Sequence, residues 1–274
     1  MLIGHEDKIK IFKTLVEKNN LSHGYLFFGE PNVGKTTFAL ALANLIEKGE
    51  FNKPDLILSE SKLIQIEEGS IGIDQIREIK HFLSQKPVSS SRRVVIIEQA
   101  GKLTSQAQNA VLKIAEEPPA SGLIILTANN PDVLLATLRS RLQLVYFGRV
   151  LEKEIVSLLE KEYGVPNKKA QEVASVSLGK PGRAVSIIED DRSKEGVDLV
   201  NKFLKGSETR RSVAEKLADQ TDLLDIFVSH LLAELSKDTL ANHQLMSKLL
   251  GRVSMMEDFS TNKRLQIESA LWQS

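Results

Sequence analysis

The first half of the chain alternates short apolar runs with segments of helical periodicity. The apolar runs lie at residues 24–28, 56–58, 94–97, 123–127 and 144–147. One helix is predicted from about Asp74, and its apolar face consists of Ile76, Ile79, Phe82 and Leu83. Such alternation is typical of βαβ units, so the sequence predicts an α/β fold with a parallel sheet.

A second predicted helix has clear signals at both ends. Thr104 or Ser105 supplies a hydroxyl that can cap its first amides. Pro118 and Pro119 end it, because proline has no amide proton and disfavours helix in the residue before it. This helix carries Val111, Leu112 and Ala115 and lies along the chain between the runs at 94–97 and 123–127.

After Gly148 the strand pattern stops, and the remaining segments indicate helices separated by Gly, Pro and Asn. Helices are expected at 151–163 and 168–178, and the charged stretch at 189–192 is interpreted as a linker before about four more helices. The sequence therefore predicts three domains, an α/β domain at 1–148, a small helical domain at 149–192 and an all-helical domain at 193–274.

Composition narrows the classes of function. Lys and Arg total 36 and Asp and Glu total 36, so no net charge draws the whole chain to nucleic acid, and any DNA contact must be local or shared with partners. Cys is absent and the five His residues have no metal-ligand spacing, so we expect no zinc site. The N-terminus is charged and no stretch approaches the roughly 20 apolar residues of a membrane helix, which predicts a cytoplasmic protein without a membrane partner.

The strongest chemical signal is GEPNVGKT at residues 29–36, which matches the P-loop pattern G-x-x-x-x-G-K-[ST] between a strand and an apolar helix. Its glycines let backbone amides turn onto phosphate, Lys35 supplies a cation, and the Thr36 hydroxyl can bind Mg²⁺. The alternative is an ordinary glycine turn. We predict that ATP and Mg²⁺ bind here through Gly29, Asn32, Gly34, Lys35, Thr36 and Thr37.

A P-loop site needs a second carboxylate after a neighbouring strand, and the run at 94–97 ends in Glu98 and Gln99 where Asp-Glu is the common pattern. Glu98 keeps the charge and is a candidate Mg²⁺ ligand together with Thr36. Gln99 can orient a water but cannot take its proton. Because general-base assistance is worth ~10²–10⁴ in rate, we expect weak or absent hydrolysis. The alternative, a mere strand end, stays open.

Several phrases in a fixed order resemble the AAA+ clamp-loader ATPases, most closely the delta-prime subfamily of bacterial DNA polymerase III. The phrases are IGH at 3–5, HGYLF at 23–27, PDL at 54–56, IDQIR at 73–77, NAVLK at 109–113, EEPP at 116–119, SRLQ at 140–143 and GKPGRA at 179–184. They cover about the first 190 residues. The resemblance implies an AAA+ nucleotide-binding domain, a helical lid and an all-α collar domain.

The resemblance also implies roles for two residues outside the P-loop. Asn129 would be the first sensor of the γ-phosphate, and Arg141 would be an arginine finger acting in trans on a neighbouring subunit's ATP. Without the family, Arg141 would be an ordinary salt-bridge partner. The implied partners are the clamp-loader motor and delta subunits in a hetero-pentamer, the sliding clamp, and primer-template DNA through the assembled complex.

The sequence departs from the family at several positions. Leu142 stands where the family has Cys, the four-cysteine zinc module is missing from about 49–53, and Gly182 stands at the second-sensor arginine with Arg183 one place off. With Gln99, these departures favour a delta-prime type assembly subunit. An active AAA+ ATPase, either a motor subunit or a helicase loader, is the alternative, and a small-molecule P-loop kinase is the weakest hypothesis.

Two further sets of residues allow more than one interpretation. Arg92-Arg93 and Arg210-Arg211 are candidate DNA-phosphate contacts, although isolated pairs are usually solvated. Leu271 and Trp272 are either collar anchors or part of a terminal helix docked on its own core, which we favour.

Overall fold

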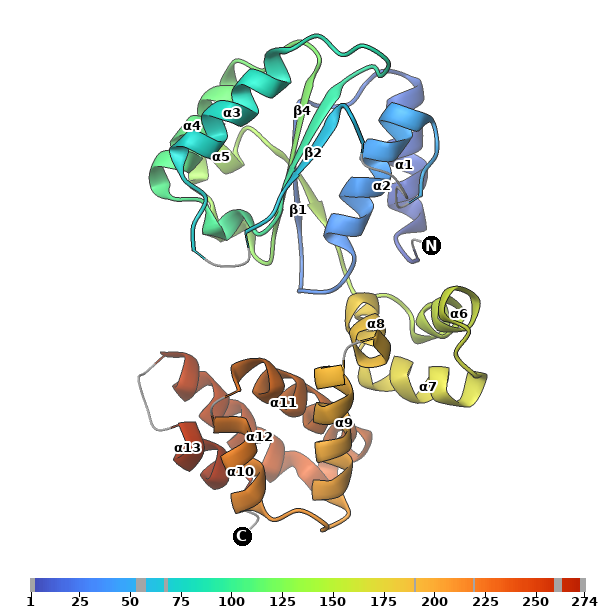
Figure 1. Ribbon diagram of the computed structural model, residues 1–274, viewed down its shortest axis with the longest axis vertical. Helices are drawn as coiled ribbons and strands as arrows, with labels where there is room; N and C mark the ends of the chain where they lie inside the picture. Colours follow the sequence, from blue (N-terminus) through green and yellow to red (C-terminus); the bar gives the residue numbers. More distant parts are fainter. Residues whose placement is uncertain are drawn as a thin grey trace. The chain divides into compact units, whose positions relative to one another are not determined.

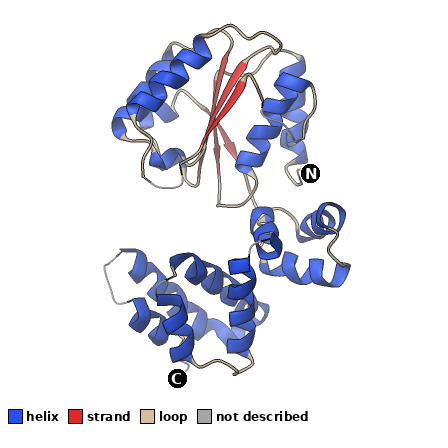
Figure 2. Cartoon of the chain, in the orientation of Figure 1, coloured by secondary structure: helices blue, strands red, loops and turns tan. Residues whose placement is uncertain are grey.

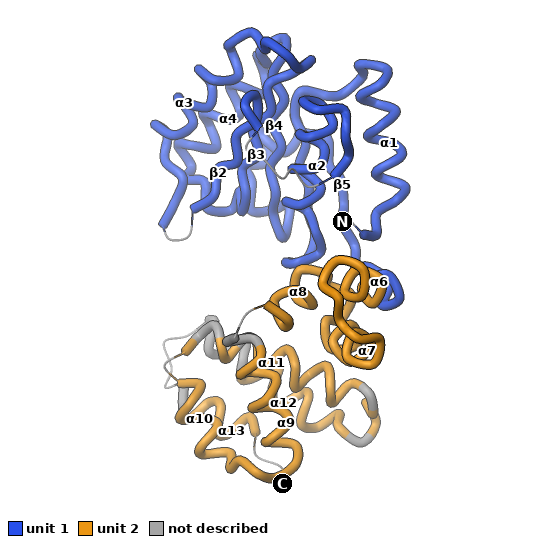
Figure 3. Tube along the Cα trace, turned by 45° about the vertical axis from the view of Figure 1, so that its right-hand side comes forward, with its two compact units in different colours: residues 1–154 blue, residues 155–274 orange. Residues whose placement is uncertain are grey.

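The computed structural model describes residues 3–52, 58–66, 69–189, 191–218, 220–258 and 263–271. The chain divides into two compact units, Met1–Glu154 and Ile155–Ser274 (Figure 3). All the described strands belong to the first unit, and the second is built from helices (Figure 2). The finer division of the helical half at residue 192 stays a prediction.

The first unit is organised around a parallel sheet with the strand order β2-β3-β4-β1-β5. The strands are β1 Gly24–Phe28, β2 Ser61–Ile64, β3 Arg93–Ile97, β4 Gly122–Ala128 and β5 Gln143–Tyr146. In the ladder, Phe28 lies opposite Ala128, and Ile97 lies opposite Leu126. The carboxyl ends of β3, β4 and β1 are therefore neighbours, and the segments that follow them meet at one edge of the sheet.

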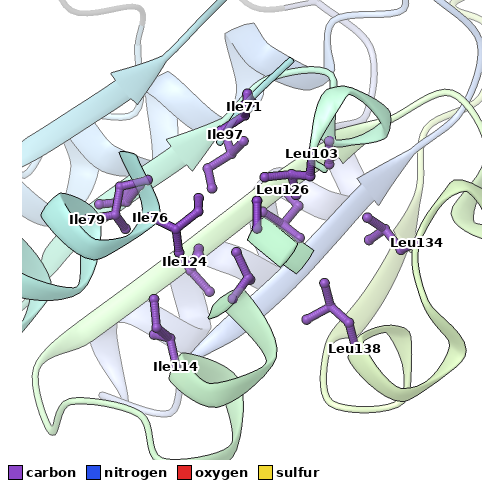
Figure 4. Close-up of a cluster of buried hydrophobic side chains, with 14 of the residues drawn as sticks. Ile71, Ile76, Ile79, Ile97, Leu103, Ile114, Ile124, Leu126, Leu134 and Leu138 are labelled. Atoms are coloured by element: carbon purple, nitrogen blue, oxygen red, sulfur yellow. The ribbon is translucent and has the colours of Figure 1, made fainter. Parts of the chain in front are cut away.

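Helices cover both faces of this sheet (Figure 1). One layer consists of α1 Glu6–Glu17 and α2 Lys35–Lys48, and the other consists of α3 Ile73–Ser84, α4 Ser105–Glu116 and α5 Ala136–Arg139. Successive residues of β1 serve the two layers, since Leu26 belongs to the core beneath α3 to α5 and Phe27 to the core beneath α1 and α2. Figure 4 shows Ile76 and Ile114 among the side chains of the former core.

The predicted sequence signals of α3 and α4 are confirmed. All four predicted face residues of α3 are buried, from Ile76 to Leu83. Thr104 is the N-cap of α4, and its Oγ1 accepts a hydrogen bond from the Ala107 amide at 3.1 Å. α3 begins one residue from its predicted start, and α4 begins at Ser105 and ends two residues before Pro118, because these signals are local to the chain.

The second strand was predicted too early. The strand is β2, Ser61–Ile64, whereas Leu58 lies outside it and packs in the core beneath α2; residues 56 and 57 lie outside the described part of the chain. β2 is at the edge of the sheet and only partly buried, so its sequence mixes polar and apolar residues. The inner strands β1, β3 and β4 are marked by continuous apolar runs, whereas the edge strand β2 is not.

The second unit consists of α-helices and one short 3-10 turn in its described part. They are α6 Glu152–Tyr163, which begins in the first unit, α7 Asn167–Val176, α8 Pro181–Glu189, α9 Asp191–Leu204, α10 Arg210–Ala218, α11 Thr221–Leu235, η3 Ser236–Asp238, α12 Thr239–Asp258 and α13 Lys263–Ala270. The helices predicted at 151–163 and 168–178 are confirmed as α6 and α7. No helix described is both long and apolar enough to cross a membrane.

Two predictions for this unit need correction. Five α-helices rather than four follow residue 190 in the described segments, and α9 begins at Asp191, inside the predicted linker. Acidic residues are favourable in the first turn of a helix, so a charged run marks a helix start as readily as a linker. Leu271 is buried against the core formed by α9 to α13, whereas Trp272 lies outside the described residues.

Candidate nucleotide site

The P-loop lies between β1 and α2, and its backbone conformation explains its glycines. Gly29, Asn32 and Gly34 have φ angles of 146°, 64° and 98°, a region that favours glycine and tolerates asparagine. A Cβ on Gly29 would lie 2.1 Å from the Phe147 carbonyl oxygen, whereas one on Gly34 would meet nothing within 4 Å. Gly29 is therefore fixed by packing, and Gly34 leaves room for a phosphate beside the first turn of α2.

Lys35 places a buried cation inside this loop. Its side chain is 8% exposed, and its Nζ donates hydrogen bonds to the carbonyls of Gly29 and Glu30 at 2.7 and 2.6 Å. The Asn129 Oδ1 atom, from the segment after β4, lies 3.5 Å from the same Nζ. The start of α2 adds the positive end of its dipole, so the loop is suited to an anion.

Thr36 and Glu98 meet directly next to this cation. The Thr36 hydroxyl donates to Glu98 Oε1 at 2.6 Å, and the other carboxylate oxygen of Glu98 accepts a hydrogen bond from the Gln65 side-chain amide. A hydroxyl and a carboxylate are oxygen ligands of the kind that Mg²⁺ prefers, so the donor set fits the predicted metal. Gln65 follows β2, and it went unnoticed in the sequence because that strand was misplaced.

Gln99 has an unusual backbone conformation for its residue type. Its φ of 52° and ψ of 58° are left-handed, its side chain is exposed, and its amide donates to Thr127 Oγ1 at 3.2 Å. Strained residues of this kind cluster at functional sites. The residue after Glu98 is thus held at the sheet edge by β4, with an amide in place of a carboxylate.

Two further contacts tie the P-loop to its surroundings. The His5 Nε2 atom lies 3.0 Å from the Val33 carbonyl oxygen, and its ring packs edge-on against Phe147; burial lowers the pKa of His5, which favours a neutral ring that donates through Nε2. Arg149, after β5, donates two hydrogen bonds to the Glu30 carboxylate at 2.9 and 3.1 Å, and these bonds raise the pKa of Arg149.

A family model described as "DNA polymerase III, delta subunit" matches residues 4–150, more than half of the chain. The chain belongs to the AAA+ clamp-loader family. DNA polymerase III subunit delta' of Escherichia coli is 34% identical over 124 residues, covering 45% of this chain and 37% of that protein. A replication factor C small subunit of Methanococcus vannielii is 30% identical over 195 residues, covering 69% of this chain and 59% of that protein.

Other clamp-loader proteins match more of the chain at lower identity. A DNA polymerase III subunit gamma/tau of Mycoplasma genitalium is 25% identical over 272 residues, covering 95% of this chain and 43% of that protein. The chain therefore spans 37% to 59% of the length of these three relatives.

Two solved structures agree with the AAA+ fold. A gamma subunit-related protein of Thermotoga maritima superposes with a TM-score of 0.60 at 21% identity, covering 96% of this chain and 97% of that one. A RuvB mutant from the same organism gives 0.52 at 17% identity, covering 73% and 65% of the two chains. At these identities the likeness concerns the fold alone.

Arg141, the proposed finger of this clamp-loader chain, lies apart from the residues gathered around Lys35. Its side chain is 53% exposed, and its Nη2 atom lies 3.8 Å from Glu116 Oε1, a long contact that holds it weakly. Leu142 beside it is buried, and its Cδ2 fills the space over Gly24 in β1. The position that carries Cys in the family is thus a packing position here.

The remaining lid candidates lie in the second unit. Gly182 and Arg183 are in the first turn of α8. Burial lowers the pKa of Arg183 to about 10, and its Nη2 atom has no hydrogen-bond partner within the described part of the chain. A second-sensor role for Arg183 stays a prediction.

Thr37, the last of the predicted P-loop residues, lies in the first turn of α2 and is half-buried.

Arg92 is neither solvated nor available for DNA, so both hypotheses were wrong for this residue, whereas Arg93 is partly exposed and its two interpretations stay open. The Arg92 side chain is buried and donates to the carbonyls of Leu21 and Ser22 at 2.8 and 3.2 Å. Arg93 donates to the Gln85 carbonyl and lies 4.8 Å from the centre of the Phe82 ring. Arg92 thus joins segments that are distant in sequence, whereas Arg93 contacts the end of the preceding helix. Arg211 pairs with Glu215 on the surface of α10.

Proposed function

We propose that the chain is a delta-prime type clamp-loader subunit of DNA polymerase III. In this proposal it holds ATP and Mg²⁺ with little or no hydrolysis, and it supplies Arg141 in trans to a motor ATPase. Together with motor and delta subunits in a hetero-pentamer, it would help to place the sliding clamp on primed DNA in the cytoplasm. The family membership supports this class of assembly.

Nucleotide binding is supported by the convergence of groups from four segments at one sheet edge. The P-loop contributes the space beside Gly34, α2 contributes Lys35 and Thr36, and the segments after β3 and β4 contribute Glu98 and Asn129. Together they offer a cation for phosphate oxygens and two oxygen ligands for Mg²⁺. Bound Mg²⁺·ATP would supply a polarised γ-phosphate, which Asn129 could contact.

Gln99 is the single observation that carries the claim of weak hydrolysis. The only carboxylate contributed by the segment after β3, that of Glu98, is already hydrogen-bonded to Thr36 and Gln65. A side-chain amide at residue 99 cannot accept a proton from the attacking water. Without a base, the site would retain its affinity for nucleotide and lose ~10²–10⁴ in rate.

The trans role of Arg141 is supported by its exposure and by contrast with its neighbour Arg139. Arg139 is bonded to the Asp132 carboxylate and is less exposed, whereas among the described residues the Arg141 side chain makes only the long contact with Glu116. A guanidinium on the surface with a weak partner can be redirected to a phosphate of another subunit at small cost.

ATP turnover tests the proposal. The chain alone should be nearly silent, and mixed with its organism's motor subunit it should support turnover that Arg141→Ala lowers by ~10³-fold or more. Arg139→Ala is the matched control and should leave the turnover close to that of the wild type. Size-exclusion chromatography should show that both variants still assemble. Full turnover by an assembled Arg141→Ala complex would refute the trans finger.

The second candidate function is an active AAA+ ATPase. It is favoured by one observation, the intact geometry of Lys35, Thr36 and Glu98. Brisk turnover by the isolated chain that is lost in Lys35→Ala would establish this function and would overturn our interpretation of Gln99.

A further inference from the structure

Helices α3 and α4 form a surface groove that the proposed nucleotide function does not use. The groove has a volume of about 390 Å³. Its lining contains apolar side chains, Ile73, Ile76, Ala110 and Ile114, and polar or charged ones, Arg77, Lys80, Gln106, Asn109 and Lys113. The two helices run side by side over the sheet in Figure 1.

The groove has a firm apolar floor. Ile76 and Ile114 are 1% and 2% exposed and belong to the core of the first unit, where Figure 4 shows them. Ala110, which is partly buried, also lines the groove with a small side chain. Asn109 and Lys113, one helical turn apart, lie on the rim. Both belong to the NAVLK phrase at 109–113, none of whose residues takes part in the nucleotide site described above.

The rim of the groove is positively charged. Arg77 pairs with Asp74 at 2.7 Å, and both side chains are exposed. Neither Lys80 nor Lys113 makes an ion pair with any residue that the structure describes. The groove therefore combines an apolar floor with two uncompensated ammonium groups, although the chain as a whole has no net charge.

We propose that this groove is a docking site for a segment of another protein in which apolar side chains are flanked by acidic ones. The apolar side chains would cover Ala110 and the isoleucines, and the carboxylates would meet Lys80 and Lys113. A nucleic acid fits less well, because no aromatic ring lines the groove to stack on a base and its floor is apolar. The proposal is independent of nucleotide binding.

A labelled peptide tests the site on the full 274-residue chain. The probe is a short fluorescein-labelled helix with Leu along one face and Glu elsewhere, and fluorescence anisotropy measures its binding. We expect saturable binding that Lys80→Glu combined with Lys113→Glu weakens by about 10-fold or more. The matched control is Lys10→Glu combined with Lys18→Glu on and just after α1, which should leave binding unchanged.

A second variant separates the contribution of the groove's shape to peptide binding from that of its rim charges. Ala110→Leu would fill the groove and should weaken binding by about 10-fold while the rim charges remain. Equal binding of a peptide with Lys in place of Glu would overturn the proposal, as would charge reversal without effect or no saturable binding at low salt. A single-stranded oligonucleotide that displaces the peptide and binds more tightly would assign the groove to nucleic acid instead.

Discussion

The Thr36 hydroxyl lies 2.6 Å from the Glu98 carboxylate, although 62 positions separate the two residues in the chain. Parallel pairing explains the meeting, because the ends of β1 and β3 lie at the same edge of the sheet on either side of β4. The strand order therefore brings the candidate metal ligands together.

Gln65→Ala should weaken Mg²⁺-dependent nucleotide binding. The Gln65 amide holds one oxygen of Glu98, and loss of a residue that orients a metal ligand typically costs 10- to 100-fold in metal affinity. We expect the Kd for Mg²⁺·ATP to rise by about 10-fold, measured by titration calorimetry. Binding in EDTA should be unchanged, and Gln85→Ala is the control. An equal loss with and without Mg²⁺ would show that Gln65 acts on the fold instead.

Gln99→Glu should create hydrolytic activity. The substitution is nearly isosteric, keeps the left-handed backbone and supplies the missing base, so turnover by the isolated chain should rise by about 10²-fold or more in a phosphate-release assay. Lys35→Ala in the same background should abolish the gain. If the variant binds ATP and stays silent, the absence of a base is not what limits the site.

The stability of the first unit should fall in acid through Glu60. Burial alone would raise the pKa of this carboxyl. Hydrogen bonds from Ser90, Val88 and Ser89 outweigh the effect of burial and lower the pKa from 4.5 to about 2. Well above pH 4.5 the carboxylate is charged in both states and its stabilisation is complete. Below that pH the unfolded chain takes up the proton first, so the free energy of unfolding falls as the pH drops towards 2.

Glu60→Gln tests this assignment by urea unfolding at several pH values. The variant should be less stable at pH 7 by about 1–3 kcal/mol, because a neutral amide replaces a charged acceptor. It should also lose less stability than the wild type between pH 4.5 and about 2. Parallel pH profiles for the two proteins would exclude Glu60 as the source.

Gly29→Ala should destabilise the first unit by at least about 2 kcal/mol, because the new Cβ would collide with the Phe147 carbonyl at a φ of 146°. Thermal unfolding measures the loss. Gly251→Ala in α12, whose Cβ would meet nothing within 4 Å, should instead stabilise its helix by about 0.5–1 kcal/mol. Equal effects at the two positions would contradict the packing assigned to Gly29.

The sequence predicted those parts of the fold and site that depend on short stretches of chain. The P-loop is continuous with its strand and helix, and Glu98 directly follows an apolar run, so both could be placed from their neighbours. Gln65 could not, because β2 is an edge strand whose half-exposed residues lack a clear apolar pattern.

The burial of the charged side chains of Arg92 and Glu60 could not be predicted from the sequence, for a different reason. Arg92 is satisfied by the carbonyls of Leu21 and Ser22, some 70 positions earlier, and Glu60 by the amides of the loop after α3. Only the tertiary fold brings such groups together. Charged residues next to one another in the sequence can therefore be structural even where the chain suggests a solvated surface.

The close fit of Gly29 against Phe147 also bears on how movement passes along the chain. The P-loop cannot shift towards β5 without a clash with the Phe147 carbonyl. The Glu30 carboxylate of the same loop accepts two hydrogen bonds from Arg149, two residues after Phe147. The P-loop and the segment after β5, which carries Phe147 and Arg149, are thus held together by these contacts. A displacement of the loop would therefore press on the segment that leads from β5 to the start of α6 at Glu152.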